Sequence, residues 1–75
     1  MQHRAPILRH FGEAIRQERK RLGISQEQLG LQAEINRSYM GSVERGEVNI
    51  SLLTIQKLCT VLKVKPSGLL SSGGH

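Results

Sequence analysis

Several residue types are rare or missing in this chain of 75 residues. It contains no tryptophan and no aspartate, and only one cysteine, one tyrosine and one phenylalanine. A single cysteine, Cys59, cannot form an internal disulfide, which excludes a small secreted fold held together by disulfides. No apolar run approaches the roughly 18 residues that a membrane span requires, and the N-terminal segment lacks the apolar centre of a signal peptide. We therefore expect a small cytoplasmic protein in a reducing compartment.

The length and composition indicate one small globular domain. With 37% hydrophobic and 23% charged residues, the chain has an ordinary globular composition rather than that of a disordered protein. A chain of this size buries only roughly 60% of its unfolded surface, which excludes a second domain or a large enzyme. We expect a single domain over residues 1–75, ordered from about residue 7 to residue 70, with a disordered tail at 71–75.

The formal charge of +5 is unevenly distributed along the chain. Residues 1–23 carry six basic and two acidic residues, a net charge of +4, and residues 51–75 carry three lysines and no acid, a net charge of +3. Between them, residues 24–50 carry two arginines and four glutamates, a net charge of −2. Excess positive charge favours phosphate as a partner, but it lies at the two ends. The function of the middle segment must therefore be inferred from its motifs.

The spacing of apolar residues predicts helices and shows neither strand alternation nor internal repeats. A first helix begins near Pro6 and is stopped by Gly23, a fourth begins after Ser51, and a short last helix begins at Pro66. Four or five helices in a chain this short make the predicted fold all-α. The apolar residues on the faces of these three helices are Leu8, Phe11, Ile15, Leu22, Leu52, Ile55, Leu58, Cys59, Val61, Leu62, Leu69 and Leu70.

Two short helices joined by a tight turn are predicted in the middle of the chain. Ser25 is a good N-cap, and Gln28 completes a capping box for a helix from Gln26 to Ala33. Asn36 caps a second helix from Arg37 to Glu44. Helices that cross closely need a small residue where they touch and apolar residues around it. These requirements are met by Gly30, Leu29, Ala33, Ile35, Met40 and Val43.

This segment resembles the Cro/C1-type (XRE-like) helix-turn-helix domain of phage repressors and bacterial regulators, over the stretch ISQEQLGLQAEINRSYMGSVERGEVN at residues 24–49. The run NRSYMGSVERG is most similar to the controller proteins of restriction–modification systems. The resemblance covers about residues 8–70 and implies a compact five-helix, lambda-repressor-like domain with its motif at about residues 25–45. It also implies a homodimeric, nucleoid-associated regulator of double-stranded operator DNA, with no cofactor, metal or small-molecule effector.

The resemblance assigns DNA contacts to individual residues. The second motif helix is expected to enter the major groove, where Arg37 is the best candidate to recognise a guanine edge. Gln26 begins the first motif helix, whose free N–H groups and positive dipole end favour a phosphate. Further expected contacts are Ser38, Ser42 and Tyr39 to bases, and Arg45, Asn49 and Ser25 to phosphates, although Ser25 also has a structural role as the cap.

Two structural roles complete this assignment. By resemblance, Glu44 forms an ion pair with Arg19 of the first helix, which ties the helices together. The chain also has more leucines than a core this small can hide, so some of them are candidates for a dimer interface. These candidates are Leu52, Leu53, Leu69 and Leu70.

Three positions depart from local rules or from the family pattern. Glu34 stands in the turn where the family usually has glycine, and a left-handed residue with a Cβ costs roughly 1–2 kcal/mol. The turn is therefore expected to be either distorted or strained. Glu47 and Val48 replace a more basic pair, which is expected to weaken a phosphate contact. Gly41 lies inside a helix, where it costs roughly 0.8–1 kcal/mol relative to alanine, so we expect DNA or a neighbouring helix to approach it closely.

Other functions were weighed against this interpretation. A phage-type repressor, or an antitoxin that acts partly through protein binding, would keep the same fold. A membrane-surface helix would expose Phe11 and Ile15, which the core needs. No histidine lies near Cys59 in sequence, and there is no glycine-rich phosphate loop, so no enzyme is expected. His10 and Glu13 have a spacing seen in metal sites but lack further ligands, and Cys59 is expected to be a buried apolar residue.

Overall fold

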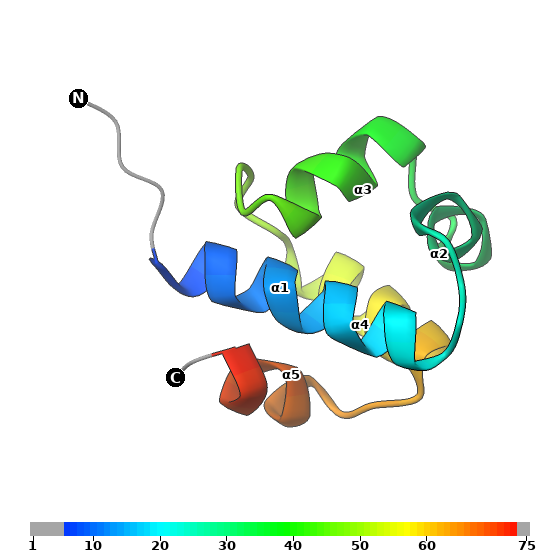
Figure 1. The fold of residues 1–75 in the computed structure, drawn as a ribbon. Coiled ribbons are helices and arrows are strands. Elements are labelled where there is room, and N and C mark those ends of the chain that lie inside the picture. Colours follow the sequence, from blue (N-terminus) through cyan, green and yellow to red (C-terminus); the bar gives the residue numbers. More distant parts are fainter. Residues whose placement is uncertain (1–5, 74–75) are drawn as a thin grey trace.

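The chain folds into five α-helices, with no strand among the residues that the structure describes. The computed structural model describes residues 6–73, and side chains from residue 6 to residue 69. The helices are α1 (Pro6–Arg21), α2 (Gln26–Ala33), α3 (Arg37–Glu44), α4 (Leu52–Leu62) and α5 (Pro66–Gly73), arranged as Figure 1 shows. The prediction of an all-α, five-helix fold is confirmed.

The short helices begin at the caps that the sequence predicts. The hydroxyl of Ser25 accepts a hydrogen bond from the backbone N–H of Gln28 at 3.0 Å, and Oε1 of Gln28 accepts from the N–H of Ser25 at 2.7 Å. Oδ1 of Asn36 accepts from the backbone N–H of Ser38 at 2.8 Å. The hydroxyl of Ser51 caps α4 in the same way. These bonds pair amide groups that the start of a helix leaves without a partner inside the helix.

Two helices end at residues in the left-handed conformation that are not glycine. Glu34 follows α2 with φ 58° and ψ 45°, and Lys63 follows α4 with φ 60° and ψ 42°. The turn after α2 therefore keeps the geometry that glycine usually adopts and is strained rather than distorted. The backbone N–H of Glu34 donates to carbonyls at the end of α2, which offsets part of the cost.

One hydrophobic cluster, to which all five helices contribute, forms the core. Cys59 belongs to it, and burial raises the pKa of its thiol, as expected for a buried apolar residue rather than a reactive cysteine. Its buried members are Phe11, Ala14, Ile15, Leu29, Ala33, Met40, Val43, Leu58, Cys59, Leu62 and Leu69.

The structure corrects the sequence analysis at three leucines. Leu69 is expected both to be buried by the last helix and to be a candidate for a dimer interface; it is 1% exposed, so the burial is confirmed and the interface assignment is wrong. Leu52 was placed on the apolar face of its helix, but it is 83% exposed in the first turn of α4. Leu22 was placed on the apolar face of the first helix, but it follows the last residue of α1 and is exposed. The side chain of Leu70 lies outside the described residues.

The last helix extends further than the sequence analysis expected. The disordered tail was placed at residues 71–75, whereas α5 continues to Gly73. Serine is only moderately unfavourable in helices, so Ser71 and Ser72 do not end the helix before that glycine. Gly74 and His75 lie outside the described residues.

The backbones of α1 and of the end of α3 are in direct contact. A Cβ atom on Gly12 would lie 2.5 Å from the carbonyl oxygens of both Val43 and Glu44. Gly46 has φ +72°, and a Cβ atom there would lie 2.7 Å from the Cα atom of Arg9. Only glycine fits this close approach, so these two positions determine how α1 supports the C-terminal end of α3.

An ion pair between Arg19 of α1 and Glu44 of α3 also connects these two helices. Nε of Arg19 lies 2.8 Å from Oε2 of Glu44, and Nη2 lies 3.1 Å from Oε1. This is the paired geometry in which a guanidinium binds a carboxylate through two parallel hydrogen bonds. The two side chains are 13% and 5% exposed. The ion pair that the resemblance implies is therefore present, and it is shielded from solvent.

The contact at Gly12 predicts that Gly12→Ala lowers the free energy of unfolding, by about 1–3 kcal/mol, because the new methyl group meets backbone atoms that cannot move aside easily. Urea denaturation measures the change. Gly68→Ala is the matched control, since nothing lies within 4 Å of that position in α5. There alanine should stabilise the protein by up to about 1 kcal/mol. A Gly12→Ala variant as stable as the wild type would show that α1 and α3 are not in backbone contact.

The ion pair predicts that Glu44→Gln destabilises the fold by about 2–3 kcal/mol, because the guanidinium of Arg19 stays shielded without its counter-charge. Thermal and urea denaturation measure the loss. The control is Glu13→Gln, which removes an exposed carboxylate on α1 whose ion pair with Arg16 spans 4.0 Å. Such a pair contributes about 0–1 kcal/mol. Equal effects of the two substitutions would contradict a special role for Glu44.

Candidate nucleic-acid interface

A polar depression lies where the start of α2 faces α3. Its lining residues on α3 and at the C-cap of that helix recur at intervals of three or four positions, which places them on one face of the helix. The structure therefore brings together five of the eight residues that the sequence analysis expected to contact DNA. The depression is lined by Gln26, Arg37, Ser38, Gly41, Ser42 and Arg45, and we call it the reading groove.

The other three expected contact residues lie outside the reading groove. Tyr39 is half-buried and packs against the core, because its position on α3 turns it away from the exposed face. The hydroxyl of Ser25 is engaged in the cap of α2. Asn49 is exposed in the segment between α3 and α4. Contacts of these three residues with DNA remain predictions.

Gln26 is fixed in the reading groove by the carboxylate of Glu44. Its Nε2 donates to Oε1 of Glu44 at 3.2 Å, and the same oxygen accepts from Arg19. An ionised carboxylate only accepts hydrogen bonds, so the nitrogen of the Gln26 amide must face it. The amide oxygen consequently faces α3, 3.4 Å from the place that a Cβ atom on Gly41 would occupy. One carboxylate thus connects α1, α2 and α3.

The first turns of α3 present polar side chains to solvent. Arg37 and Ser38 are exposed. The hydroxyl of Ser42 donates to the backbone carbonyl of Ser38 at 3.2 Å, which leaves its oxygen available as an acceptor. An exposed arginine at the start of such a helix can donate two parallel hydrogen bonds to the O6 and N7 atoms of a guanine.

Arg45 enters the reading groove from the opposite end of α3. Its Nε donates to Oε2 of Glu47 at 3.0 Å, and this hydrogen bond together with the charge of Glu47 raises the pKa of the guanidinium. Its Nη1 lies 3.0 Å from the place of a Cβ atom on Gly41. Glu47 was expected only to weaken a phosphate contact, whereas it directly contacts an arginine of the groove.

The two glycines of the motif have different surroundings. A Cβ atom on Gly30 would lie 2.8 Å from the carbonyl oxygen of Ile35 and 3.2 Å from the side chain of Met40, so the small residue expected between the motif helices is needed there. At Gly41 the nearest neighbours of such a Cβ atom would instead be the side chains of Arg45 and Gln26, at 3.0 and 3.4 Å. The reason for a glycine at position 41 therefore lies in the reading groove and not in helix packing.

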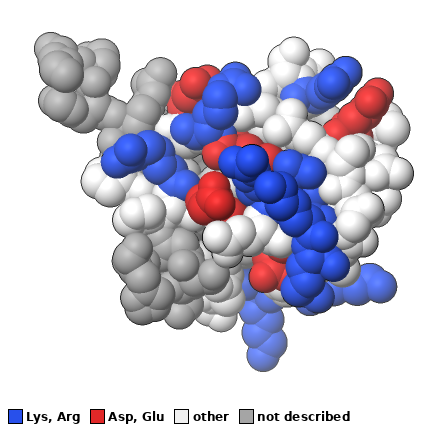
Figure 2. All heavy atoms as spheres, viewed as in Figure 1, with Lys and Arg blue, Asp and Glu red and all other residues white. Residues whose placement is uncertain are grey.

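Positive charge also gathers outside the reading groove, whose own lining contains Arg37 and Arg45. Figure 2 shows Lys and Arg side chains across the middle of one face, where α1 runs in Figure 1, with acidic side chains among them. The last turn of α1 alone contains Arg19, Lys20 and Arg21. This arrangement agrees with the charge distribution of the sequence, in which the middle segment is acidic.

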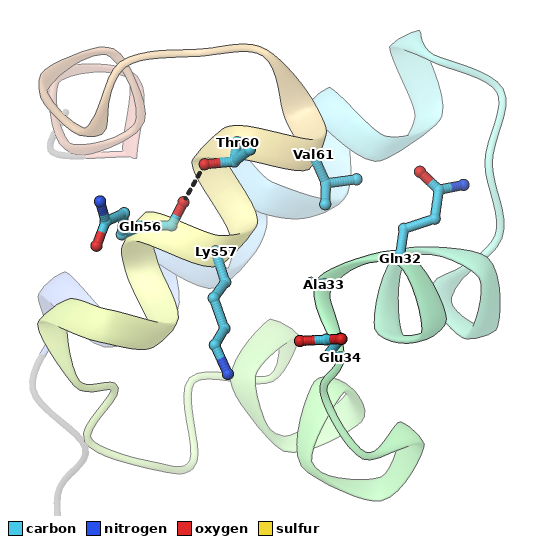
Figure 3. A pocket seen from close by; sticks show the side chains of 7 residues that line it. All are labelled: Gln32, Ala33, Glu34, Gln56, Lys57, Thr60 and Val61. Carbon is cyan, nitrogen blue, oxygen red and sulfur yellow. Dashed lines mark hydrogen bonds between the residues drawn. The ribbon is translucent and has the colours of Figure 1, made fainter.

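A second hollow lies at the other end of α2, against α4. Figure 3 shows Glu34 and Lys57 entering it from different elements, with the hydroxyl of Thr60 bonded to the carbonyl of Gln56 at 2.9 Å. Within residues 6–73, no group of three His, Cys, Asp or Glu residues is placed to hold a metal ion. None of the helices in that range is both long and apolar enough to cross a membrane.

Comparison with known proteins identifies the fold and the family. A family model described as helix-turn-helix matches residues 15–69. The chain is 39% identical over 61 residues to the control protein C.BamHI of Bacillus amyloliquefaciens, covering 80% of this chain and 75% of that protein. It is 34% identical over 62 residues to the control protein C.MunI of a Mycoplasma species, covering 81% and 84% of the two chains.

A solved structure agrees with these relatives. The restriction–modification controller protein C.AhdI from Aeromonas hydrophila is 45% identical to this chain and superimposes with a TM-score of 0.80, over 83% of this chain and 94% of that one. The chain therefore belongs to the helix-turn-helix family, a family of transcription regulators and not of enzymes, and within it to the control proteins of restriction–modification systems.

Proposed function

We propose that this protein binds double-stranded operator DNA sequence-specifically as a homodimer and regulates transcription within a restriction–modification system. The reading groove supports this proposal, because it gathers a guanine-reading candidate and several polar side chains on the exposed face of a short, well-supported helix. Two relatives that match the chain over most of their length are control proteins, and the solved structure C.AhdI is a restriction–modification controller protein. The proposed place of action is the cytoplasm, in association with the DNA.

The proposed binding combines two kinds of contact. Phosphate contacts supply affinity without sequence preference, and the basic residues of α1 and of the chain ends supply long-range attraction. Side chains of the reading groove supply the preference for one sequence. The amide of Gln26 is held in place by Glu44 before DNA arrives, so this contact loses little conformational entropy on binding.

A second copy of the chain is the proposed partner in this binding. One helix of eight residues reads only a few base pairs, so useful affinity requires two such helices on one face of the duplex. Two half-sites would then be separated by about 34–36 Å, one turn of the DNA helix. Regulation would follow from protein concentration, because dimer formation and operator binding are coupled.

Selection of bound duplexes from a random pool tests the proposal as a whole. A twofold-symmetric dimer should enrich a palindromic consensus, whereas a protein that recognises only phosphates should enrich none. Failure to enrich any sequence would overturn the proposal. The selected duplex and a scrambled version of it then serve as specific and non-specific probes.

Removing the Arg37 side chain should reduce discrimination between these two duplexes. Loss of a guanine contact costs about 1–3 kcal/mol, so Arg37→Ala should weaken binding to the selected duplex by that amount and leave the scrambled duplex nearly unaffected. Fluorescence anisotropy titrations measure both affinities. Arg16→Ala removes another exposed arginine, on α1 and outside the groove, and should leave discrimination unchanged. Equal losses on both duplexes would reassign Arg37 to a phosphate contact.

The dimer is proposed to form through the two exposed leucines at the start of α4. Leu52 and Leu53 are 83% and 61% exposed, and adjacent apolar side chains of this kind favour burial against a second copy. Leu52→Gln/Leu53→Gln should shift the protein towards the 8.4 kDa monomer in sedimentation equilibrium. Leu31→Gln is the matched control, because Leu31 is 74% exposed on α2. A double variant that stays dimeric would show that the interface lies elsewhere.

A further inference from the structure

The guanidinium of Arg45, whose side chain is 59% exposed, has a neighbour on each of two sides in the reading groove. On one side, Glu47 accepts a hydrogen bond from its Nε at 3.0 Å. On the other, its Nη1 lies 3.0 Å from the place that a Cβ atom on Gly41 would occupy. Glu47 is not among the residues that line the groove, so it holds the arginine from outside while the Nη end points inward.

The wall opposite Arg45 is also fixed. The amide oxygen of Gln26 lies 3.4 Å from the same place above Gly41, and the amide nitrogen is bonded to the shielded carboxylate of Glu44. That carboxylate is bonded in turn to Arg19 of α1. The space above Gly41 is therefore bounded by a side chain that the core network holds in one orientation, and we call this space the Gly41 gap.

We propose that Arg45 is a second base-reading residue of this protein, with Glu47 and the Gly41 gap as the features that position it. The inference rests on the proposed function, since it concerns the same DNA surface. The ligand is the edge of a guanine. Because Nε of Arg45 is hydrogen-bonded to Glu47, the donors left for DNA are the N–H groups of Nη1 and Nη2. These two nitrogens can donate side by side to the O6 and N7 atoms of a guanine.

A base contact explains the arrangement better than a phosphate contact does. A phosphate contact depends mainly on charge, so an arginine that only neutralises phosphate gains nothing from a carboxylate placed 3.0 Å from its Nε. A base reader instead needs a fixed orientation, which Glu47 and the Gly41 gap supply. Glycine inside a helix also lowers stability relative to alanine, and the Gly41 gap gives this position a function.

Gly41→Ala tests the inference because it affects stability and recognition in opposite directions. The new Cβ atom would lie 3.0 Å from Nη1, so the guanidinium would have to shift by a few tenths of an ångström from its present orientation, while alanine favours the helix. We expect a thermal midpoint equal to or above that of the wild type. Binding to the selected duplex should be weaker by about fivefold or more, with the scrambled duplex unchanged. Gly68→Ala, with open space around it, should leave both affinities unchanged.

Arg45→Lys provides the second test, since lysine keeps the charge but lacks the planar pair of donors. Repeating the selection with this variant should remove the preference for one guanine in each half-site, at a position different from the one lost with Arg37→Ala. The dependence of affinity on salt should stay the same, because the number of positive charges is unchanged. Glu47→Ala should lower discrimination by about two- to fivefold, as expected for loss of an exposed ion pair, and Glu47→Gln, which keeps an acceptor for Nε, should lower it less.

The outcomes separate this inference from the proposed function. If the wild-type chain selects a consensus, but Gly41→Ala and Arg45→Lys keep the full preference at every position, Arg45 does not read a base and the inference is wrong. Weakening of both duplexes by the same factor would likewise overturn it and make Arg45 a phosphate contact. If the wild-type chain selects no consensus, it is the proposed function that fails.

Discussion

The carboxylate of Glu44 lies at the point where three helices meet, and the position of the reading helix depends on it. It accepts hydrogen bonds from Arg19 of α1 and from Gln26 of α2, and its side chain is almost fully shielded from water. A carboxylate can be buried at acceptable cost only when charged and polar donors surround it. Because these donors come from two other helices, Glu44 fixes the end of α3 relative to both of them.

This constraint matters because α3 is too short to be stable by itself. Isolated helices of fewer than about 12–15 residues are marginal in water, and α3 has eight residues. Its stability comes from Met40 and Val43, which are buried in the core, and from the contact of its last carbonyls with Gly12. The opposite face of α3 does not pack against the core, so its side chains are available for recognition. Helical periodicity thus places the core-packing residues and the groove-lining residues of α3 on different faces.

Local features of this fold could be predicted from the sequence, and contacts between distant residues could not. The first residues of α2 and α3 follow from Ser25, Gln28 and Asn36, whose side chains cap the N-terminal ends of these helices. No local pattern shows that Gly12 meets the carbonyls of α3, because a glycine within an amphipathic helix gives no sign of a partner 31 residues away. A steric test of each glycine is therefore more informative than its position in a motif.

The same distinction applies to the leucines and to the candidate site. Leu52 and Leu69 look alike in the sequence, but only the packing of α5 decides that Leu69 belongs to the core. Four of the expected DNA contacts lie together because helical spacing determines which residues of α3 and its C-cap share a face, whereas Gln26 joins them from α2 through tertiary packing. The contact between Arg45 and Glu47 depends on the conformation of the turn that follows α3, which spacing alone does not determine.

The distribution of charge suggests how so small a protein could keep non-specific binding low. Every phosphate contact strengthens binding to all DNA equally, and a regulator needs a high ratio of specific to non-specific affinity. In this chain the segment of residues 24–50 has a net charge of −2, and the excess positive charge lies at the two ends. Under the proposed function, much of the attraction to the duplex would come from basic residues outside the reading groove, which itself contributes Arg37 and Arg45. Glu47 pairs with Arg45, so the affinity that this arginine contributes would depend more on hydrogen-bond geometry than on charge.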